Sequence, residues 1–141
     1  MSQPSPARLV GFSATPTFYR IVLAEMGEVY LKCGADILIN GLKTNLEAEA
    51  RCPVCGAITS FRLAEKLIED LTPRDPTLHV VEFEMEPGHL RVECKSTHIF
   101  DKKECLSKWR STYSGKPGRI MSLPEYMVSL NQRPPRKVSP A

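Results

Sequence analysis

A cysteine and an aspartate, Cys33 and Asp36, lie three residues apart in the apolar stretch KCGADILIN. In a helix, residues with this spacing share one face, so a thiol would stand beside a carboxylic acid. Thiolates select soft metals, whereas a carboxyl is a poor ligand for them. If Cys94 joins the pair, the three groups would suit a site that holds a soft ion while a proton moves.

The other cysteines leave two further interpretations open. The segment C-P-V-C-G places Cys52 and Cys55 at the spacing of a zinc knuckle, in which two thiolates grip one tetrahedral ion. Cys94 with His98, or Cys105, would complete such a site. Alternatively the thiols are packing residues, because free cysteine is among the most buried residue types. Cys105 fits that interpretation best.

The composition bounds the class of protein. The chain has 141 residues, 42% hydrophobic and 25% charged, which predicts one ordinary globular domain. A net charge of +3 gives no sign of a nucleic-acid or membrane partner. Apolar runs are far shorter than the roughly 20 residues of a membrane span, and the first residues lack a signal-peptide pattern. With an odd number of cysteines, these features predict a cytoplasmic protein with reduced thiols.

The spacing of apolar residues predicts the elements that must position these groups. Residues 18–42 follow a three-and-four spacing and are expected to be helical, with breaks at Gly27 and Gly34. Residues 46–52 and 58–63 alternate with period two, so we expect a hairpin around C-P-V-C-G.

The pattern changes along the rest of the chain. Residues 64–71 have the pattern of a short amphipathic helix, and residues 77–85 and 89–94 that of two strands. Asp101 and Glu104 predict the capped start of a further helix, which should end shortly before the next glycine.

Ser122 and Glu125 repeat the capping-box pattern ahead of a last helix. Together the elements predict an α+β fold, with a small antiparallel β-sheet flanked by helices in a single domain. The expected core is 18–131. A flexible N-terminal segment (1–17) would precede it, and a flexible proline-rich basic tail (132–141) would follow.

Three motifs in order resemble one family. KCGADILIN looks like the first active-site segment of bacterial organomercurial (alkylmercury) lyases, and ARCPVCGAITSFRL is similar to their next segment. VECKSTHIFDKKECLSKW resembles the last signature of that family, and GRIMSLPEYMVSL its closing strand and helix. The likeness runs from about residue 18 to 131, as the catalytic core of such a lyase without the N-terminal helical extension.

The resemblance implies a role for each matching residue. Cys33 and Cys94 would bind mercury and Asp36 would handle the proton, so these three form the catalytic set. Cys52 would match the family's structural cysteine, outside the reacting site. His98 would be a hydrogen-bond donor beside the site or a packing residue, and no role is assigned to the other histidines. We expect lowered pKa values for the thiols and, if Asp36 is buried, a raised pKa for its carboxyl.

The implied activity is protonolysis of carbon–mercury bonds, in mercury resistance, to a hydrocarbon and Hg(II). Beyond external thiols no cofactor would be required, and Hg(II) would be the bound product. Under the zinc-knuckle interpretation, which rests on the spacing and not on the resemblance, Cys52 and Cys55 would hold a structural zinc. The partners would be a small organomercury substrate and a mercuric reductase that receives the product. One alternative is a thiol-based metal-binding or zinc-knuckle protein without catalytic activity. Another is an interaction domain whose basic tail (Arg133, Arg136, Lys137) contacts an anionic partner.

Overall fold

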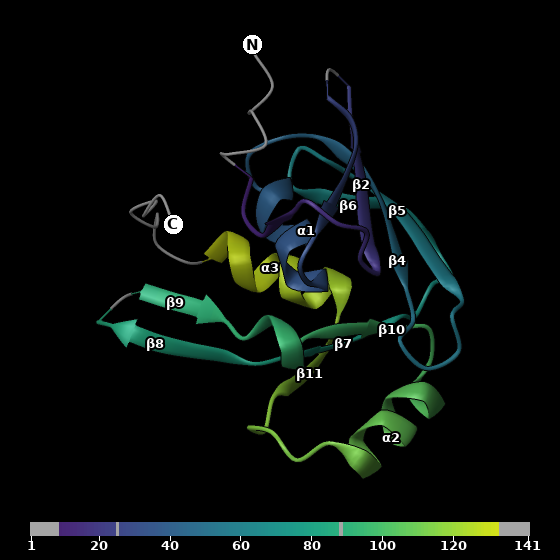
Figure 1. Cartoon of the computed structure of the whole chain (residues 1–141). Helices are drawn as coiled ribbons and strands as arrows, with labels where there is room; N and C mark the ends of the chain where they lie inside the picture. The colour runs from purple at the N-terminus through teal and green to yellow at the C-terminus, as the bar shows by residue number, and fades with distance from the viewer. Residues whose placement is uncertain (1–8, 25, 88, 133–141) are drawn as a thin grey trace.

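Six antiparallel strands form the largest sheet of the structure, a computed structural model that describes residues 9–24, 26–87 and 89–132 (Figure 1). The strands are β1 (Phe12–Ser13), β2 (Tyr19–Leu23), β3 (Gly27–Leu31), β4 (Leu46–Arg51), β5 (Ile58–Ala64) and β6 (Leu67–Thr72). Their spatial order is β1-β3-β2-β4-β5-β6. The β4–β5 pair confirms the hairpin expected around C-P-V-C-G.

The helix predicted over residues 18–42 is wrong for most of its length. A hairpin of β2 and β3 occupies the first part, and only Gly34–Gly41, α1, is helical. Burial along β2 alternates strictly, because its side chains point to opposite faces of the sheet. The β-branched and aromatic residues of this segment favour strands, and that preference outweighed an apolar spacing that also fits a helix.

The helix predicted over residues 64–71 is also wrong. Strand β5 ends at Ala64 and β6 begins at Leu67, so Glu65 and Lys66 form a two-residue hairpin loop. Both loop residues have positive φ, 50° and 67°, as a type I′ turn requires. Glycine or asparagine usually supplies that conformation, so the sequence carried no turn signal here.

Two smaller sheets follow in the chain. The first has the order β10-β7-β11 and contains β7 (Thr77–Val80), β10 (His98–Phe100) and β11 (Arg119–Ser122). The second is the hairpin of β8 (Glu82–Glu86) and β9 (His89–Val92). Strands were expected in both regions, but residues 77–85 divide at Val81 between two sheets.

The last two helices are α2 (Lys103–Thr112) and α3 (Leu123–Gln132). The capping box before α3 is confirmed. The Ser122 N–H donates to Glu125 Oε1 at 2.9 Å, and the Glu125 N–H donates to Ser122 Oγ at 3.1 Å. The cap predicted at Asp101 is wrong, since α2 begins after Lys102 and has no side-chain cap.

Helix α1 is the centre of the core. All its residues are buried, and it contacts α3, β10 and the strands β2 to β5 of the large sheet (Figure 1). The predicted α+β class with antiparallel sheets and helices in a single domain is confirmed. Among the described residues, no helix is long and apolar enough to cross a membrane.

The predicted terminal segments are only partly described. In the segment 1–17, Leu9 is buried in the core and Phe12 begins β1. The tail residues 133–141 lie outside the described residues. The flexibility expected of both segments stays a prediction.

Candidate active site at the start of α1

Cys33 and Asp36 meet through the cap of α1. Cys33 is the N-cap residue, with extended backbone (φ −151°, ψ 166°), and Asp36 is the third residue of the helix. The Cys33 N–H donates to Asp36 Oδ2 at 3.3 Å, and the Asp36 N–H faces the Cys33 sulfur. The pair is therefore adjacent, as expected, but through reciprocal capping and not through a shared helical face.

Cys94 completes the group from a distant part of the chain. It begins the short 3-10 helix η2 (Cys94–Ser96), which follows β9. Its thiol lies 3.7 Å from Asp36 Oδ2, and the ligand atoms of Cys33, Asp36 and Cys94 all lie within 4.8 Å of one another. Cys33 and Asp36 are buried and Cys94 is half-buried, so the site is open to solvent on the Cys94 side. We call these three residues the α1 cluster.

Two histidines hold the backbone that carries Cys94. The buried His79 on β7 is bonded through Nδ1 to the Ser96 carbonyl at 2.7 Å. His98 is bonded through Nε2 to the Lys95 carbonyl at 3.1 Å, and its Nδ1 lies 3.0 Å from the Tyr19 hydroxyl. Burial lowers the pKa of His98. A neutral ring can donate from Nε2 and accept from Tyr19, which fits both bonds. His98 is thus a hydrogen-bonding residue next to the site.

His79 was missed by the sequence analysis. No local pattern marked it, because its partner Ser96 lies on another element and the bond forms only when β7 and β10 pair. Two bonds to successive carbonyls fix η2, so the thiol of Cys94 is held against α1.

Gly11 was also missed, although it touches the carboxyl. Its φ is +72°, and a Cβ added there would lie 1.9 Å from Asp36 Oδ2. Nearby, the Val10 N–H and carbonyl each bond to the Asn40 side chain at 2.9 Å. Only glycine fits this position, where the chain before β1 covers the Asp36 carboxyl.

Cys33 and Asp36 favour their protonated forms. Burial raises the pKa of Asp36 above its ordinary value of 3.8, although hydrogen bonds from Cys33 and Cys94 lower it in part. The hydrogen bond with Cys94, burial and the nearby Asp36 charge raise the pKa of Cys33. The raised pKa expected for Asp36 is confirmed, whereas the lowered pKa expected for Cys33 is wrong. The apolar start of α1 disfavours a free thiolate.

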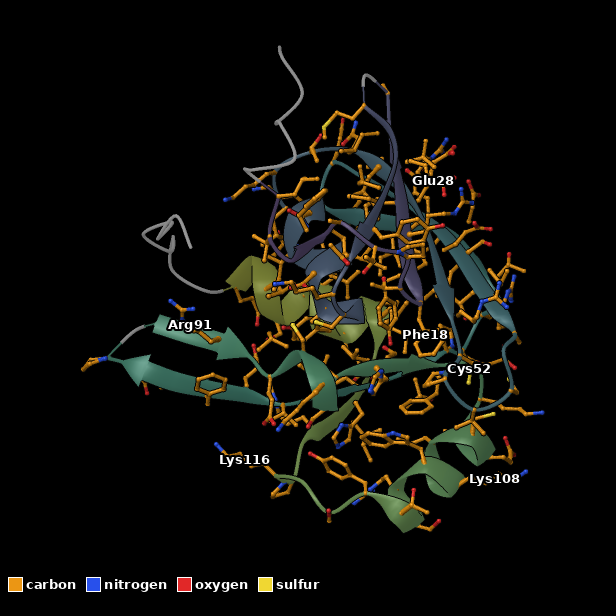
Figure 2. All side chains as sticks on the ribbon, in the orientation of Figure 1. Phe18, Glu28, Cys52, Arg91, Lys108 and Lys116 are labelled. Atoms are coloured by element: carbon orange, nitrogen blue, oxygen red, sulfur yellow. The ribbon has the colours of Figure 1, made fainter. Side chains whose placement is uncertain are left out.

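The remaining cysteines form a separate group. The sulfurs of Cys52, Cys55 and Cys105 lie within 4.8 Å of one another, where the β4–β5 turn meets α2. Figure 2 shows Cys52 at this end of the hairpin, close to α2. Of the candidates to join Cys52 and Cys55, the structure therefore brings Cys105 close, whereas Cys94 lies in the other group. We call these three residues the α2 cluster.

A family model and a solved structure that match this chain are of one kind. A family model described as MerB, alkylmercury lyase, matches residues 12–132. The crystal structure of the mercury-bound form of MerB2 is similar to this chain, with a TM-score of 0.68 and 23% sequence identity. The likeness covers 86% of this chain and 59% of that one, so this chain spans less than two thirds of that relative's length. No curated protein sequence matches. The family model covers most of the chain and the solved relative has the same fold, so the chain belongs to the alkylmercury lyase family.

Proposed function

We propose that this protein cleaves carbon–mercury bonds by protonolysis, releasing a hydrocarbon and leaving Hg(II) on Cys33 and Cys94. The observation that carries the proposal is the α1 cluster, in which two thiols and one carboxyl from distant segments lie within 4.8 Å. Two-coordinate binding of one ion needs sulfurs separated by roughly twice a metal–sulfur bond of about 2.3 Å. The separation in the α1 cluster fits that requirement.

The substrate is a small organomercury cation, and its binding begins at Cys94. This thiol is half-buried whereas Cys33 is fully buried, so mercury reaches the Cys94 sulfur first. The Cys94 thiol gives up its proton to water as the sulfur–mercury bond forms. Mercury supplies the positive charge that makes the thiolate stable in these surroundings.

Asp36 then moves a proton from sulfur to carbon. Its carboxylate takes the proton of the Cys33 thiol, and the resulting thiolate forms the second sulfur–mercury bond. The protonated carboxyl delivers this proton to the carbon attached to mercury. The electron pair of the carbon–mercury bond forms the new carbon–hydrogen bond, so hydrocarbon leaves and Hg(II) stays between two sulfurs. The raised pKa of Asp36 suits this role, because it makes the carboxylate a better acceptor for the thiol proton than an ordinary carboxylate is.

Product release requires two external thiols, which replace the two cysteines on Hg(II) and return their protons. A mercuric reductase is a suitable recipient of the released ion. Free cysteines throughout the chain support a reducing, cytoplasmic location, where small thiols are abundant.

The proposal is tested by measuring benzene release from phenylmercury. Cys33→Ser and Cys94→Ser should each abolish release, because a serine hydroxyl does not replace a thiolate as a mercury ligand. Cys55→Ser is the matched control, since the exposed Cys55 belongs to the α2 cluster. It should release benzene at the wild-type rate per folded molecule. Equal rates in all three variants would contradict the proposed site.

Thiol-based metal binding without catalysis is the second candidate function. The presence of two separate thiol clusters favours it, since binding alone needs no carboxyl. The two candidates differ in the role of Asp36. A protein that binds phenylmercury but releases no benzene, with or without the Asp36 carboxyl, would be a metal-binding relative.

A further inference from the structure

The α2 cluster lies outside the proposed lyase site, and the proposed reaction does not use it. It contains Cys52 and Cys55 on the β4–β5 turn and Cys105 in the first turn of α2. The three sulfurs lie within 4.8 Å of one another, and all three cysteines are free thiols. Packing alone does not require this grouping, because each thiol could pack separately as a small apolar group. We propose that these three cysteines bind a structural zinc ion, with the Asp101 carboxyl as the fourth ligand.

The turn between β4 and β5 has the shape of a metal-binding knuckle. The Cys52 N–H donates to the Ala57 carbonyl at 2.9 Å, and the Gly56 N–H donates back to the Cys52 carbonyl at 3.0 Å. Gly56 has φ +77°, a conformation that glycine adopts without strain. These contacts close the loop tightly and bring the two thiols of the turn to one side, as two ligands of one ion require.

Backbone N–H groups prepare the Cys52 sulfur for negative charge. Backbone N–H groups of Asp101, Cys55 and Val54 are directed at this sulfur. A buried packing thiol would not need such a set of donors. A zinc-bound thiolate does, because its remaining lone pairs must be hydrogen-bonded.

The donor set fits zinc better than a softer ion. Cys55 Sγ lies 4.0 Å from Asp101 Oδ2, so a carboxylate oxygen lies beside one of the three sulfurs. Zinc accepts sulfur and oxygen ligands in one tetrahedral site. A bound divalent cation would hold all three thiols in their ionised forms.

A zinc ion here would fasten a helix that is mostly exposed. Only Cys105 and Leu106 of α2 are buried, and they pack in a small core with Cys52, Phe100 and the half-buried Trp109. This small core is separate from the main one around α1. The ion would join the β4–β5 turn of the large sheet to α2, across an interface with few apolar contacts.

Metal content of the purified full chain tests the proposal. Protein reduced without oxygen, loaded with Zn²⁺ and dialysed should retain one zinc per chain. The double variant Cys33→Ser/Cys94→Ser should retain it too, whereas Cys52→Ser/Cys55→Ser should lose it. Wild-type protein without zinc would overturn the proposal. So would zinc that follows Cys33 and Cys94 instead.

Cobalt substitution and fluorescence give readouts that do not depend on folding of the cysteine variants. Wild-type protein loaded with Co²⁺ should show sulfur-to-cobalt charge-transfer bands and the intense visible bands of a tetrahedral site. Asp101→Asn should keep the sulfur bands but weaken zinc binding by roughly tenfold or more. Unchanged affinity would remove Asp101 from the site.

Removal of zinc by a chelator should change the emission of Trp109, the single tryptophan of the chain. These measurements use no organomercury, so they can fail while the proposed lyase function stands.

Discussion

The α1 and α2 clusters use the same side chain in opposite electrostatic settings. In the α1 cluster, a buried thiol lies against a second thiol and a carboxyl, and the pKa of Cys33 rises. In the α2 cluster, N–H groups are directed at a sulfur, and the pKa of Cys52 falls despite its burial. Burial is common to both thiols, so the difference comes from what faces each sulfur.

This contrast teaches what each cluster can do. A group of raised pKa stores a proton until a cation displaces it, which suits a reaction that must deliver a proton to carbon. A thiol stabilised as thiolate by fixed N–H dipoles suits permanent binding of a metal ion. In the two proposals, the clusters therefore separate proton delivery from structural metal binding within one small fold.

The largest expected effect on the rate of benzene release comes from removing the carboxyl group that carries the proton in the proposed reaction. Asp36→Asn keeps the size of the side chain but cannot carry a proton from sulfur to carbon. We expect phenylmercury binding to persist and the rate of benzene release to fall by about 10²- to 10⁴-fold. Rapid-quench measurement of benzene in a single turnover, alongside mercury binding at equilibrium, separates the two steps.

Asp101→Asn is the matched variant in the α2 cluster. It should leave single-turnover benzene release unchanged, because Asp101 lies beside Cys55 and not beside the thiols proposed to bind mercury. If Asp36→Asn loses binding and cleavage together, the carboxyl shapes the site and does not relay a proton.

A smaller effect is expected where the chain covers the α1 cluster. Gly11→Ala places a Cβ 1.9 Å from Asp36 Oδ2, and Gly27→Ala meets no atom within 4 Å. Both glycines have positive φ, 72° and 74°, so backbone strain is common to the two variants. We expect Gly11→Ala to lower the free energy of unfolding by about 1–3 kcal/mol more than Gly27→Ala, from the clash alone. Urea denaturation measures both values, and equal losses would mean that Gly11 does not press on the carboxyl.

The sequence predicted which residues form the α1 cluster better than it predicted the backbone elements that hold them. Cys33 and Asp36 are local, so their spacing of three indicated a pair whether they shared a helical face or a cap. Cys94 entered as a hypothesis that the resemblance to a family then supported, because no spacing rule brings together residues that lie far apart in the chain. Strands β2 and β3 were missed for a related reason. Short apolar runs fit both the helical period of 3.6 residues and the strand period of two, and only tertiary pairing decides between them.

The supporting residues could not be predicted, because they act through the backbone. His79 and His98 bind carbonyl groups of η2, and every residue has a carbonyl, so no sequence pattern identifies the partner. Gly11 is required by the position of Asp36 in space, which the sequence does not contain. The α2 cluster was only half visible for the same reason. C-P-V-C-G marked two ligands by local spacing, whereas Cys105 depended on where α2 packs.

The smallest effect tests whether the α1 cluster stores a proton in the folded protein. The pKa of Asp36 is raised on folding, so the folded state binds this proton more tightly than the unfolded chain. The resulting stability is complete below the ordinary pKa of 3.8 and is lost as pH rises to the raised folded value. Asp36→Asn does not titrate. Its free energy of unfolding relative to wild type should therefore increase with pH across that window, by at most about 1.4 kcal/mol per pH unit, and then level off. All other titrating groups are common to both proteins and cancel in the difference, which urea titrations at a series of pH values supply. A difference that does not change with pH would show that folding leaves the pKa of this carboxyl unchanged, and the contrast between the two clusters would then lose its basis.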